Sequence, residues 1–254
     1  MSGPTTFVDL ETARATRGVR LVVASGIPSP WSEAAKGIFR VKGAPFVCLR
    51  MAPRDREVLG WTRARNVPAA MFDDEPARTG WAEILELAER VAPSPSLLPA
   101  AAEDRARMFG LAHEVMGEGG LLWSGRLITV HLGLETDGAR GFPPMIAGYL
   151  AKRYGYVRER IDVARRRVAE GWALLADALG GREHYFGKQL TALDIYSATA
   201  VNIFELMPES DCPMLPLVRA AFASTRDEMA EVPRALVAHR DRMYGRYLEL
   251  PMVL

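Results

Sequence analysis

The fold is decided by one stretch near the start of the chain, residues 19–31, which reads VRLVVASGIPSPW. Val19 to Ala24 is mostly β-branched and apolar, a composition typical of a buried strand. The next residues, Ser25 to Pro30, are rich in Ser, Gly and Pro and predict a break. From Trp31 to about Val41, apolar side chains recur at helical spacing. The stretch therefore predicts a strand, a tight connection and an amphipathic helix.

The alternation between strand-like and helix-like segments continues to residue 91. Further strands are predicted at 45–51 and 67–72, with a short fourth strand at 77–79, and further helices at 55–61 and 81–91. The resulting order is β-α-β-α-β-β-α. We therefore expect a small α/β domain over residues 1–91, of which residues 1–18 form an N-terminal extension.

A segment rich in Pro and Ser, Ala92 to Pro99 (APSPSLLP), follows this domain. Such a composition favours an extended connection, so we assign residues 92–101 to a linker. Beyond the linker the apolar pattern is helical, over residues 102–116, 121–134, 143–179, 192–206, 215–229 and 232–248. We expect residues 102–254 to form an all-helical bundle domain.

The composition is that of an ordinary globular protein: 254 residues, 49% hydrophobic and 25% charged, with a formal net charge of +1. This argues against disorder and against a general attraction to nucleic acid or an acidic membrane. Two cysteines, Cys48 and Cys212, are far apart in the sequence. They exclude a disulfide scaffold, a Cys-x-x-Cys redox motif and a cysteine-based zinc site. A single disulfide between them stays possible, although a reducing cytoplasm fits the composition better.

The sequence gives no targeting signal that we recognise. Its first 18 residues contain charges and no apolar core, and no stretch has the length of a membrane span. We therefore expect a cytoplasmic protein that acts without a membrane. Of the 32 basic residues 28 are arginines, which we interpret as codon usage in a GC-rich, bacterial genome. The arginines are scattered among carboxylates, so they do not predict a nucleic-acid site.

The first chemical candidate is Ser29-Pro30-Trp31-Ser32, between the first strand and the first helix. Ser29 suits the N-cap position and Pro30 the first helical position, so the motif is explained by capping alone. The same helix start also favours a bound anion and lowers the pKa of a thiolate held there. A serine hydroxyl donates a charge-assisted hydrogen bond to such a thiolate. Both interpretations stay open.

Two other local patterns concern the backbone. Asn66-Val67-Pro68 puts a proline at the start of a buried strand, where it cannot donate to the ladder and suits an edge, a bulge or a cis bond. Thr191-Ala192-Leu193-Asp194 has the spacing of a capping box, with Asp in place of the usual Glu. We interpret the box as structural, fixing the start of a buried helix.

These three elements, in this order, resemble the glutathione S-transferase superfamily, over roughly residues 19–248. The resemblance implies an N-terminal thioredoxin-like, glutathione-binding domain, a C-terminal helical bundle domain and a homodimer. Ser29 matches the serine of the serine-type classes, which donates to the glutathione sulfur. Val67, before Pro68, matches the residue whose backbone pairs with the cysteinyl part of the tripeptide.

One part of the resemblance departs from the family pattern. Thr79-Gly80 stands where the family usually has Glu-Ser or Asp-Ser, the pair that holds the γ-glutamyl end. Gly80 still offers a backbone N–H and Thr79 an oxygen, but each side-chain bond lost to a charged group is worth about 1.5–3 kcal/mol. Arg78 is a candidate to compensate by pairing with a glutathione carboxylate.

The second substrate would lie between the two halves, in a pocket lined by the early helices. The candidate residues are Met108, His113, Met116, Trp123 and Arg126, although apolar residues at such spacings also suit a core. His113, His131, His184 and His239 show no ligand spacing, so we predict no metal. Phe142 to Tyr156 is rich in aromatics and suits either the bundle core or a partner surface.

Three functions follow from this set. The first is an enzyme that adds glutathione to a small hydrophobic electrophile, or uses it to cleave one. The second, a thiol–disulfide or dehydroascorbate-type reductase, is disfavoured because positions 29 and 32 are both serine and Cys48 lies within an apolar strand. The third is a binding protein that keeps the fold but has weak or no glutathione affinity, as the Thr79-Gly80 departure suggests.

Overall fold

A three-stranded sheet forms the framework of the N-terminal half. In this computed structural model, which describes residues 4–52 and 55–254, β1 (Val19–Ala24) lies between β2 (Phe46–Met51) and β3 (Ala69–Phe72). β1 runs parallel to β2 and antiparallel to β3. The first three residues of the predicted N-terminal extension lie outside the described part of the chain.

The predicted fourth strand is wrong as a strand, because it is reduced to one bridge between Ala70 and Arg78. The chain turns at Asp73–Asp74 directly after β3, and α4 (Trp81–Val91) begins three residues after Arg78. Too few residues therefore remain for a longer ladder.

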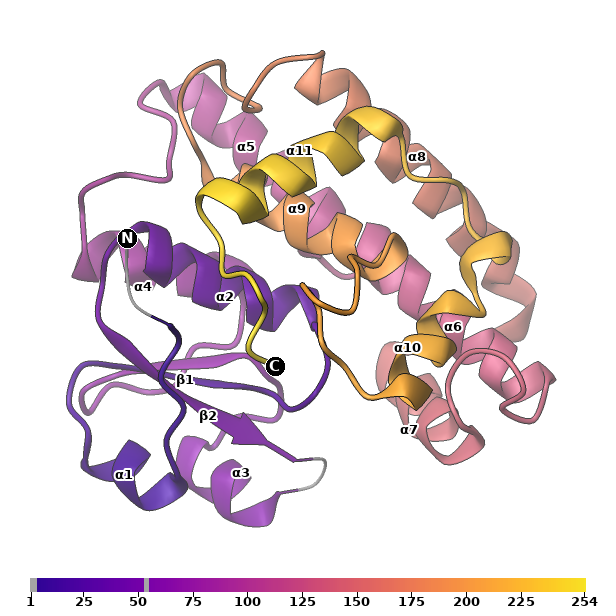
Figure 1. Cartoon of the computed structure of the whole chain (residues 1–254), viewed down its shortest axis with the longest axis horizontal. Helices are drawn as coiled ribbons and strands as arrows, with labels where there is room; N and C mark the ends of the chain where they lie inside the picture. The colour runs from indigo at the N-terminus through magenta and orange to yellow at the C-terminus, as the bar shows by residue number, and fades with distance from the viewer. Residues whose placement is uncertain (1–3, 53–54) are drawn as a thin grey trace.

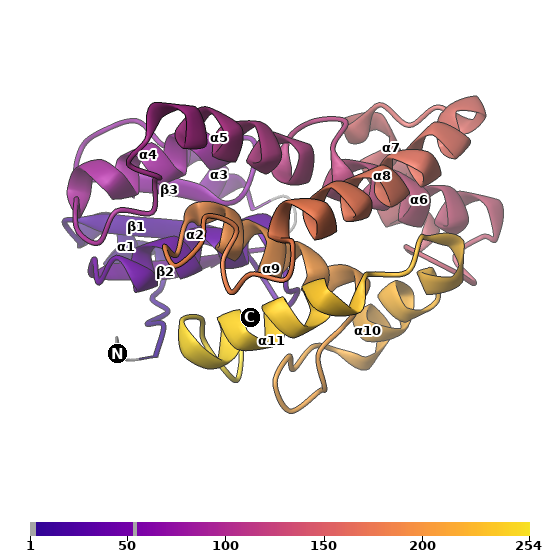
Figure 2. The same ribbon diagram turned by 90° about the horizontal axis from the view of Figure 1, so that it is seen from above.

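Helices cover both faces of the sheet (Figures 1 and 2). One face, with Val22, packs with residues of α1 (Leu10–Ala15) and α3 (Arg56–Thr62) in a small apolar cluster. The other face packs with α2 (Pro30–Val41) and α4 in a cluster that continues into the helical half. The alternation of side chains along β1 explains this division, because Leu21 and Val23 point away from Val22.

The N-terminal extension is part of the sheet half. The N–H of Cys48 donates to the carbonyl of Thr6 at 2.8 Å, and the N–H of Val8 donates to the carbonyl of Cys48 at 2.9 Å. The extension thus pairs with the outer edge of β2, which would otherwise be open. The short helix α1, which the sequence pattern did not predict, follows directly.

The helical half begins at residue 102. Its helices are α5 (Ala102–Met116), α6 (Leu121–Glu135), α7 (Pro144–Tyr154), α8 (Ile161–Leu179), α9 (Ala192–Phe204), α10 (Pro216–Ala223) and α11 (Arg234–Arg246), with short 3₁₀ turns η1 (Arg158–Arg160) and η2 (Arg226–Glu228). No helix in the described ranges combines the length and the apolar composition of a membrane span.

Two predicted helices of this half are interrupted. The helix expected over 143–179 breaks after α7, where Gly155 adopts a left-handed φ of 63°. The helix expected over 215–229 ends at Ala223. There the Ser224 and Thr225 hydroxyls donate back to the carbonyls of Ala221 and Phe222, both at 2.9 Å, an alternative to continuing the helix.

The two halves share one apolar core, in which α2 packs against α9. Gly37 permits this approach: a Cβ at Gly37 would lie 2.7 Å from Leu248 Cδ2 and 3.1 Å from Ile195 Cγ2. The C-terminal tail then passes α2 toward the sheet, where Lys36 Nζ donates to the carbonyl of Val253 at 2.8 Å (Figure 1). α2, which carries Ser29 at its start, is thus held from both halves.

Candidate functional site

Ser29 stands at the N-cap position of α2, but its side chain does not cap the helix. Its carbonyl accepts the N–H of Glu33 at 2.8 Å, and its N–H donates to the carbonyl of Ile27 at 2.8 Å. The residue is 7% exposed, and its hydroxyl has no hydrogen bond to any residue in the described ranges. The hydroxyl is therefore free to meet a ligand at a helix N-terminus.

The other residues of this first turn have structural partners. Ser32 Oγ accepts the N–H of Ala24 at 3.2 Å and so ties α2 to the end of β1. Glu33 and Lys36 form a buried ion pair at 2.8 Å. Burial raises the pKa of Glu33, and the Lys36 ammonium opposes the shift. Of the two serines, Ser29 and Ser32, only Ser29 has a side chain without a structural hydrogen bond to the described residues.

Three segments that the sequence assigned to one site lie together in space. The Val67–Pro68 peptide bond is cis. Pro68, Thr79 and Trp31 line one small cavity of about 10 Å³. This volume is close to that of a single water probe, so the first turn of α2, the cis-proline and the residues before α4 are in near contact.

The charged groups near α4 already have partners in the chain. The Arg78 guanidinium donates to Glu75 at 2.6 Å, and Arg90 donates to the same carboxylate. Hydrogen bonds from Arg90 and Arg78 lower the pKa of Glu75. The N–H of Gly80 donates to Glu83 Oε2 at 3.0 Å. A ligand at these groups would have to compete with Glu75 and displace Glu83.

A cavity of about 700 Å³ lies in the helical half and reaches Pro30, the neighbour of Ser29. Its apolar lining includes Leu122 of α6, Phe204 of α9, Phe222 of α10 and Met229. It has the size of a small-molecule site. The cavity therefore begins beside the start of α2 and extends between α6, α9 and the segment that follows α10.

The five residues predicted for this pocket are placed differently from one another. Arg126 lines the cavity, whereas Met108 is fully buried in the core and His113 is exposed on α5. Met116 is buried and lines the small cavity, and Trp123 is half-buried. Met108, His113, Met116 and Trp123 do not line this cavity. Met108 and Met116 lie on the face of α5 that packs into the core shared with α9.

The segment 222–232 is the part of the cavity that the sequence analysis missed. The apolar pattern assigned residues 222–229 to a helix, whereas beyond Ala223 the chain is irregular apart from η2, so the pattern gave no reason to place them at a pocket. A weaker signal was present, since Met229 and Val232 are apolar within a charged stretch that ends at Pro233. Such isolated apolar residues outside a helix are candidates for a pocket wall.

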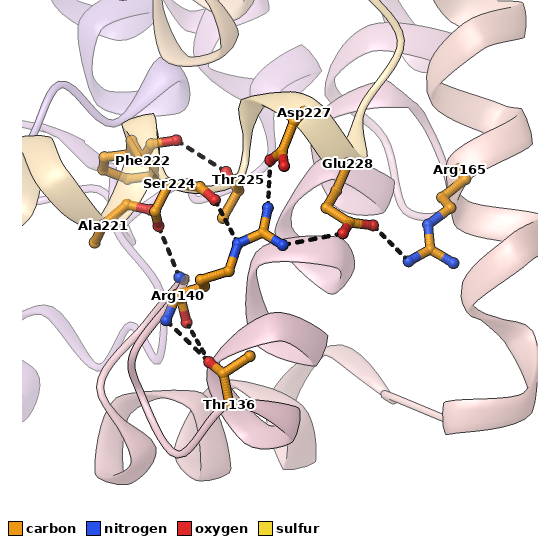
Figure 3. Close-up of polar contacts among 10 residues, drawn as sticks. Thr136, Arg140, Arg165, Ala221, Phe222, Ser224, Thr225, Asp227 and Glu228 are labelled. Carbon is orange, nitrogen blue, oxygen red and sulfur yellow. Dashed lines mark hydrogen bonds and ion pairs between the residues drawn. The ribbon is translucent and has the colours of Figure 1, made fainter.

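Arg140 fastens this wall to the loop after α6 (Figure 3). Its Nε donates to the carbonyl of Ser224 at 3.0 Å, its Nη1 donates to Glu228 at 3.1 Å, and its Nη2 donates to Asp227. Arg165 holds the other oxygen of Glu228 at 2.8 Å. One side chain thus connects the backbone and both carboxylates of the wall.

A stack of four side chains links α2 to the helical half beside the cavity. The guanidinium of Arg126 lies 5.3 Å from the ring centroid of Trp31 and 5.2 Å from that of Tyr154. Trp123 packs on the Tyr154 ring at 4.5 Å between centroids. Trp31 is fixed in turn, because its Nε1 donates to the carbonyl of Met116 at 2.9 Å.

Asp194 forms a saturated buried cluster at the start of α9. Its Oδ2 accepts the N–H and the hydroxyl of Thr191 at 2.8 and 2.9 Å, and its Oδ1 accepts the N–H of Tyr185 at 3.1 Å. The structure thus confirms that Asp194 reaches back to Thr191. His239 Nε2 and His184 Nδ1 also lie 3.1 and 3.3 Å from Oδ1.

These two histidines are a correction to the sequence analysis, which gave them no common site. They meet Asp194 from separate segments. Burial alone would raise the pKa of Asp194, but hydrogen bonds from His184, His239 and Thr191 lower it to about 2. Since its oxygens already accept several donors, the cluster has the chemistry of a helix cap.

Both cysteines are free and buried, so the possible disulfide between them is absent. Burial raises the pKa of Cys48 to about 12. Burial also raises the pKa of Cys212. Neither thiol has the exposure or the acidity of a redox nucleophile.

Comparison with solved structures places this architecture among known folds. The chain is similar to a glutathione S-transferase from Methylobacterium radiotolerans in complex with glutathione sulfonate (TM-score 0.60, 18% identity, 94% of this chain and 98% of that one). It is also similar to the β-etherase LigF from Sphingobium sp. strain SYK-6 (TM-score 0.66, 19% identity, 90% and 96%).

A third similar structure is a glutathione transferase family member from Pseudomonas fluorescens with two glutathione bound (TM-score 0.59, 16% identity, 91% and 89%). No family model and no curated protein matches the sequence. The chain thus has the glutathione S-transferase fold, a thioredoxin-like α/β half followed by a helical half, as the sequence predicted.

Proposed function

We propose that the protein is a glutathione-using enzyme that adds glutathione to a small hydrophobic electrophile, or uses glutathione to cleave one. The observation that carries this proposal is the unbonded Ser29 hydroxyl at the start of α2, beside a cavity of about 700 Å³ that reaches Pro30. Similar folds crystallised with glutathione sulfonate or glutathione support the choice of co-substrate.

In this mechanism Ser29 donates a hydrogen bond to the glutathione sulfur, and the N-terminal end of α2 favours the thiolate over the thiol. The backbone of Val67, before cis-Pro68, would pair with the cysteinyl part of the tripeptide. Thr79 and Gly80 would hold the γ-glutamyl end once Glu83 moves off the Gly80 N–H. Arg78 would contribute only by releasing Glu75.

The reaction requires the sulfur and the electrophile to be held side by side, which supplies much of the rate in such two-substrate reactions. The thiolate forms the new carbon–sulfur bond, and the leaving group departs with the electron pair of the bond that breaks. The thiol proton passes to solvent when the thiolate forms. The cavity would hold the electrophile and exclude water from its apolar part.

Substituting Ser29→Ala tests the role of Ser29, with Ser25→Ala in the same loop as the matched control. Loss of a charge-assisted hydrogen bond worth about 1.5–3 kcal/mol predicts a roughly ten- to hundredfold fall in kcat/KM. The ascending limb of the pH–rate profile would also move to higher pH, because the bound thiol becomes less acidic. Undiminished turnover in Ser29→Ala would remove Ser29 from the mechanism.

A second candidate, a binding protein of this fold with weak or no glutathione affinity, is favoured by one observation. Glu83 already occupies the Gly80 N–H, and Thr79 brings no carboxylate. Retention on glutathione-agarose and a thermal shift with millimolar glutathione separate the two candidates. Retention, a thermal shift and turnover together support the enzyme. If none of the three is found, the results support the binding protein.

The proposal includes a homodimer, which the resemblance to the family supports, and a bacterial cytoplasm, which the excess of arginine over lysine and the composition favour. Size-exclusion chromatography with light scattering measures the assembly directly. A mass of one chain at micromolar concentration would overturn the dimer without affecting the proposed chemistry.

A further inference from the structure

Arg126 is the cation of the cavity that has no carboxylate partner in the described ranges. Among the residues that the structure describes, three arginines line the cavity. Arg140 is paired with Asp227 and Glu228, and Arg226 is paired with Glu205. Arg126 instead donates to the Tyr154 hydroxyl at 3.3 Å, a neutral partner.

The acidic residues of the lining do not neutralise Arg126. Glu205 and Asp227 are engaged by Arg226 and Arg140. Glu231 is exposed and forms no ion pair within the described ranges. A guanidinium stays charged at any working pH, so a half-buried one without a counter-ion favours an anion.

The surroundings of Arg126 hold its guanidinium in one orientation. The rings of Trp31 and Tyr154 lie 5.3 and 5.2 Å from it, and Trp31 is itself anchored to Met116. Contacts of this kind use the faces of a guanidinium, so the N–H donors of Arg126 other than the Nη1 that bonds Tyr154 stay available to a ligand. The donors are therefore prepared for a planar oxyanion such as a carboxylate.

The position of Arg126 relates this charge to the proposed chemistry. It lines the same cavity as Pro30, next to Ser29, and the remainder of the lining is rich in apolar and aromatic side chains. We propose that Arg126 selects an electrophile that combines a flat apolar body with a carboxylate, the carboxylate binding to Arg126. This inference rests on the proposed function, because it names the substrate class of that site.

The test uses two electrophiles that differ in one group, 4-chloro-3,5-dinitrobenzoate and 4-chloro-3,5-dinitrobenzamide. In both, the glutathione sulfur bonds to the chlorine-bearing carbon and chloride leaves with the electron pair. Each enzymatic rate is divided by the rate without enzyme, which corrects for their different reactivity. The unaltered protein should prefer the benzoate by at least about tenfold in kcat/KM.

The variant Arg126→Gln should abolish this preference, and Arg126→Lys should keep part of it because it retains the charge. Arg226→Gln is the matched control, since Arg226 lines the same cavity but is paired, and it should keep the preference. A folded variant is confirmed by its unfolding midpoint. An unchanged preference in Arg126→Gln, or no preference in the unaltered protein, overturns the inference.

A rise in the KM for glutathione that is confined to Arg126→Gln, with the benzoate preference intact, also overturns it. That outcome would assign Arg126 to the tripeptide.

A second measurement keeps the inference separate from the proposed function. Isothermal titration calorimetry without glutathione compares the binding of 3,5-dinitrobenzoate and 3,5-dinitrobenzamide to the same variants. Tighter binding of the benzoate that depends on Arg126 supports the inference even if no turnover is found. Equal binding of the two compounds, together with normal turnover, would support the proposed function. It would also show that Arg126 does not select a substrate with a carboxylate.

Discussion

Three helix starts in this protein treat their free N–H groups in different ways. At α9, Asp194 accepts hydrogen bonds from Thr191 and Tyr185 in a fully buried cluster. At α2, Ser29 makes no capping bond. At α4, the Glu83 carboxylate in the first turn accepts the Gly80 N–H. The difference teaches that a saturated cap serves stability, whereas an unsaturated one is available for chemistry.

The largest effect should come from breaking the saturated start. Asp194→Ala leaves the Thr191 and Tyr185 donors, His184 and His239 without their acceptor in the core. We expect a loss of about 3 kcal/mol in the free energy of unfolding, since removing one partner of a buried charged network is strongly destabilising. For a chain of this size that is roughly 6–12 °C in the unfolding midpoint, measured by calorimetry.

A pH series sharpens the same point. The pKa of Asp194 is about 2 in the folded protein, against an ordinary value of 3.8 for this carboxyl. A lowered pKa stabilises the fold above the unfolded value, and this contribution is lost as the pH falls toward the folded value. Between about pH 5 and pH 3 the protein should lose roughly 1 kcal/mol more than Asp194→Asn, as urea unfolding would show. Equal losses of stability in the unaltered protein and in Asp194→Asn would contradict the lowered pKa of Asp194.

A change at the start of α4 should alter the affinity for glutathione. Glu83→Gln removes the negative charge at the N-terminus of α4, where a γ-glutamyl carboxylate would bind. An anion at this position is worth about 0.3–1 kcal/mol, so the glutathione Kd should fall roughly two- to fivefold. Glu86→Gln, an exposed change on the same helix, is the control. Weaker binding in Glu83→Gln would show instead that Glu83 contacts the ammonium of the tripeptide.

The smallest expected effect is that of Ser29→Ala on the free energy of unfolding. Because its hydroxyl makes no bond in the described ranges, Ser29→Ala should change the free energy of unfolding by less than about 0.5 kcal/mol. Urea unfolding of the variant beside Ser25→Ala measures this. A loss near 1 kcal/mol or more would return Ser29 to the role of a cap.

The sequence was most informative where local chemistry decides the structure. The strand at 19–24 and the helices at 81–91 and 102–116 match the structure at both ends. The expected helix over 143–179 is interrupted between Gly155 and η1, because helical spacing of apolar residues resumes in α8 and the pattern does not show a break this short. α1 was missed because six residues are too few to show a period.

The candidate site was less predictable than the fold. Met108 and Arg126 both lie on the early helices, yet one is in the core and the other in the cavity. Helical spacing gives the inward face but not whether the space there is filled. His184 and His239 reach Asp194 from separate segments, so no local spacing could reveal their meeting.

The contacts between the C-terminal tail and α2 join segments of the chain that are synthesised at different times. Arg40 pairs with Glu249 at 2.7 Å, Thr5 donates its N–H to the same carboxylate at 2.7 Å, and Lys36 bonds the carbonyl of Val253. During synthesis the sheet half leaves the ribosome long before residues 249–253 exist. Until those residues are made, α2 lacks the Glu249 carboxylate and the Val253 carbonyl as partners, and Lys36 has only the Glu33 carboxylate of its own helix.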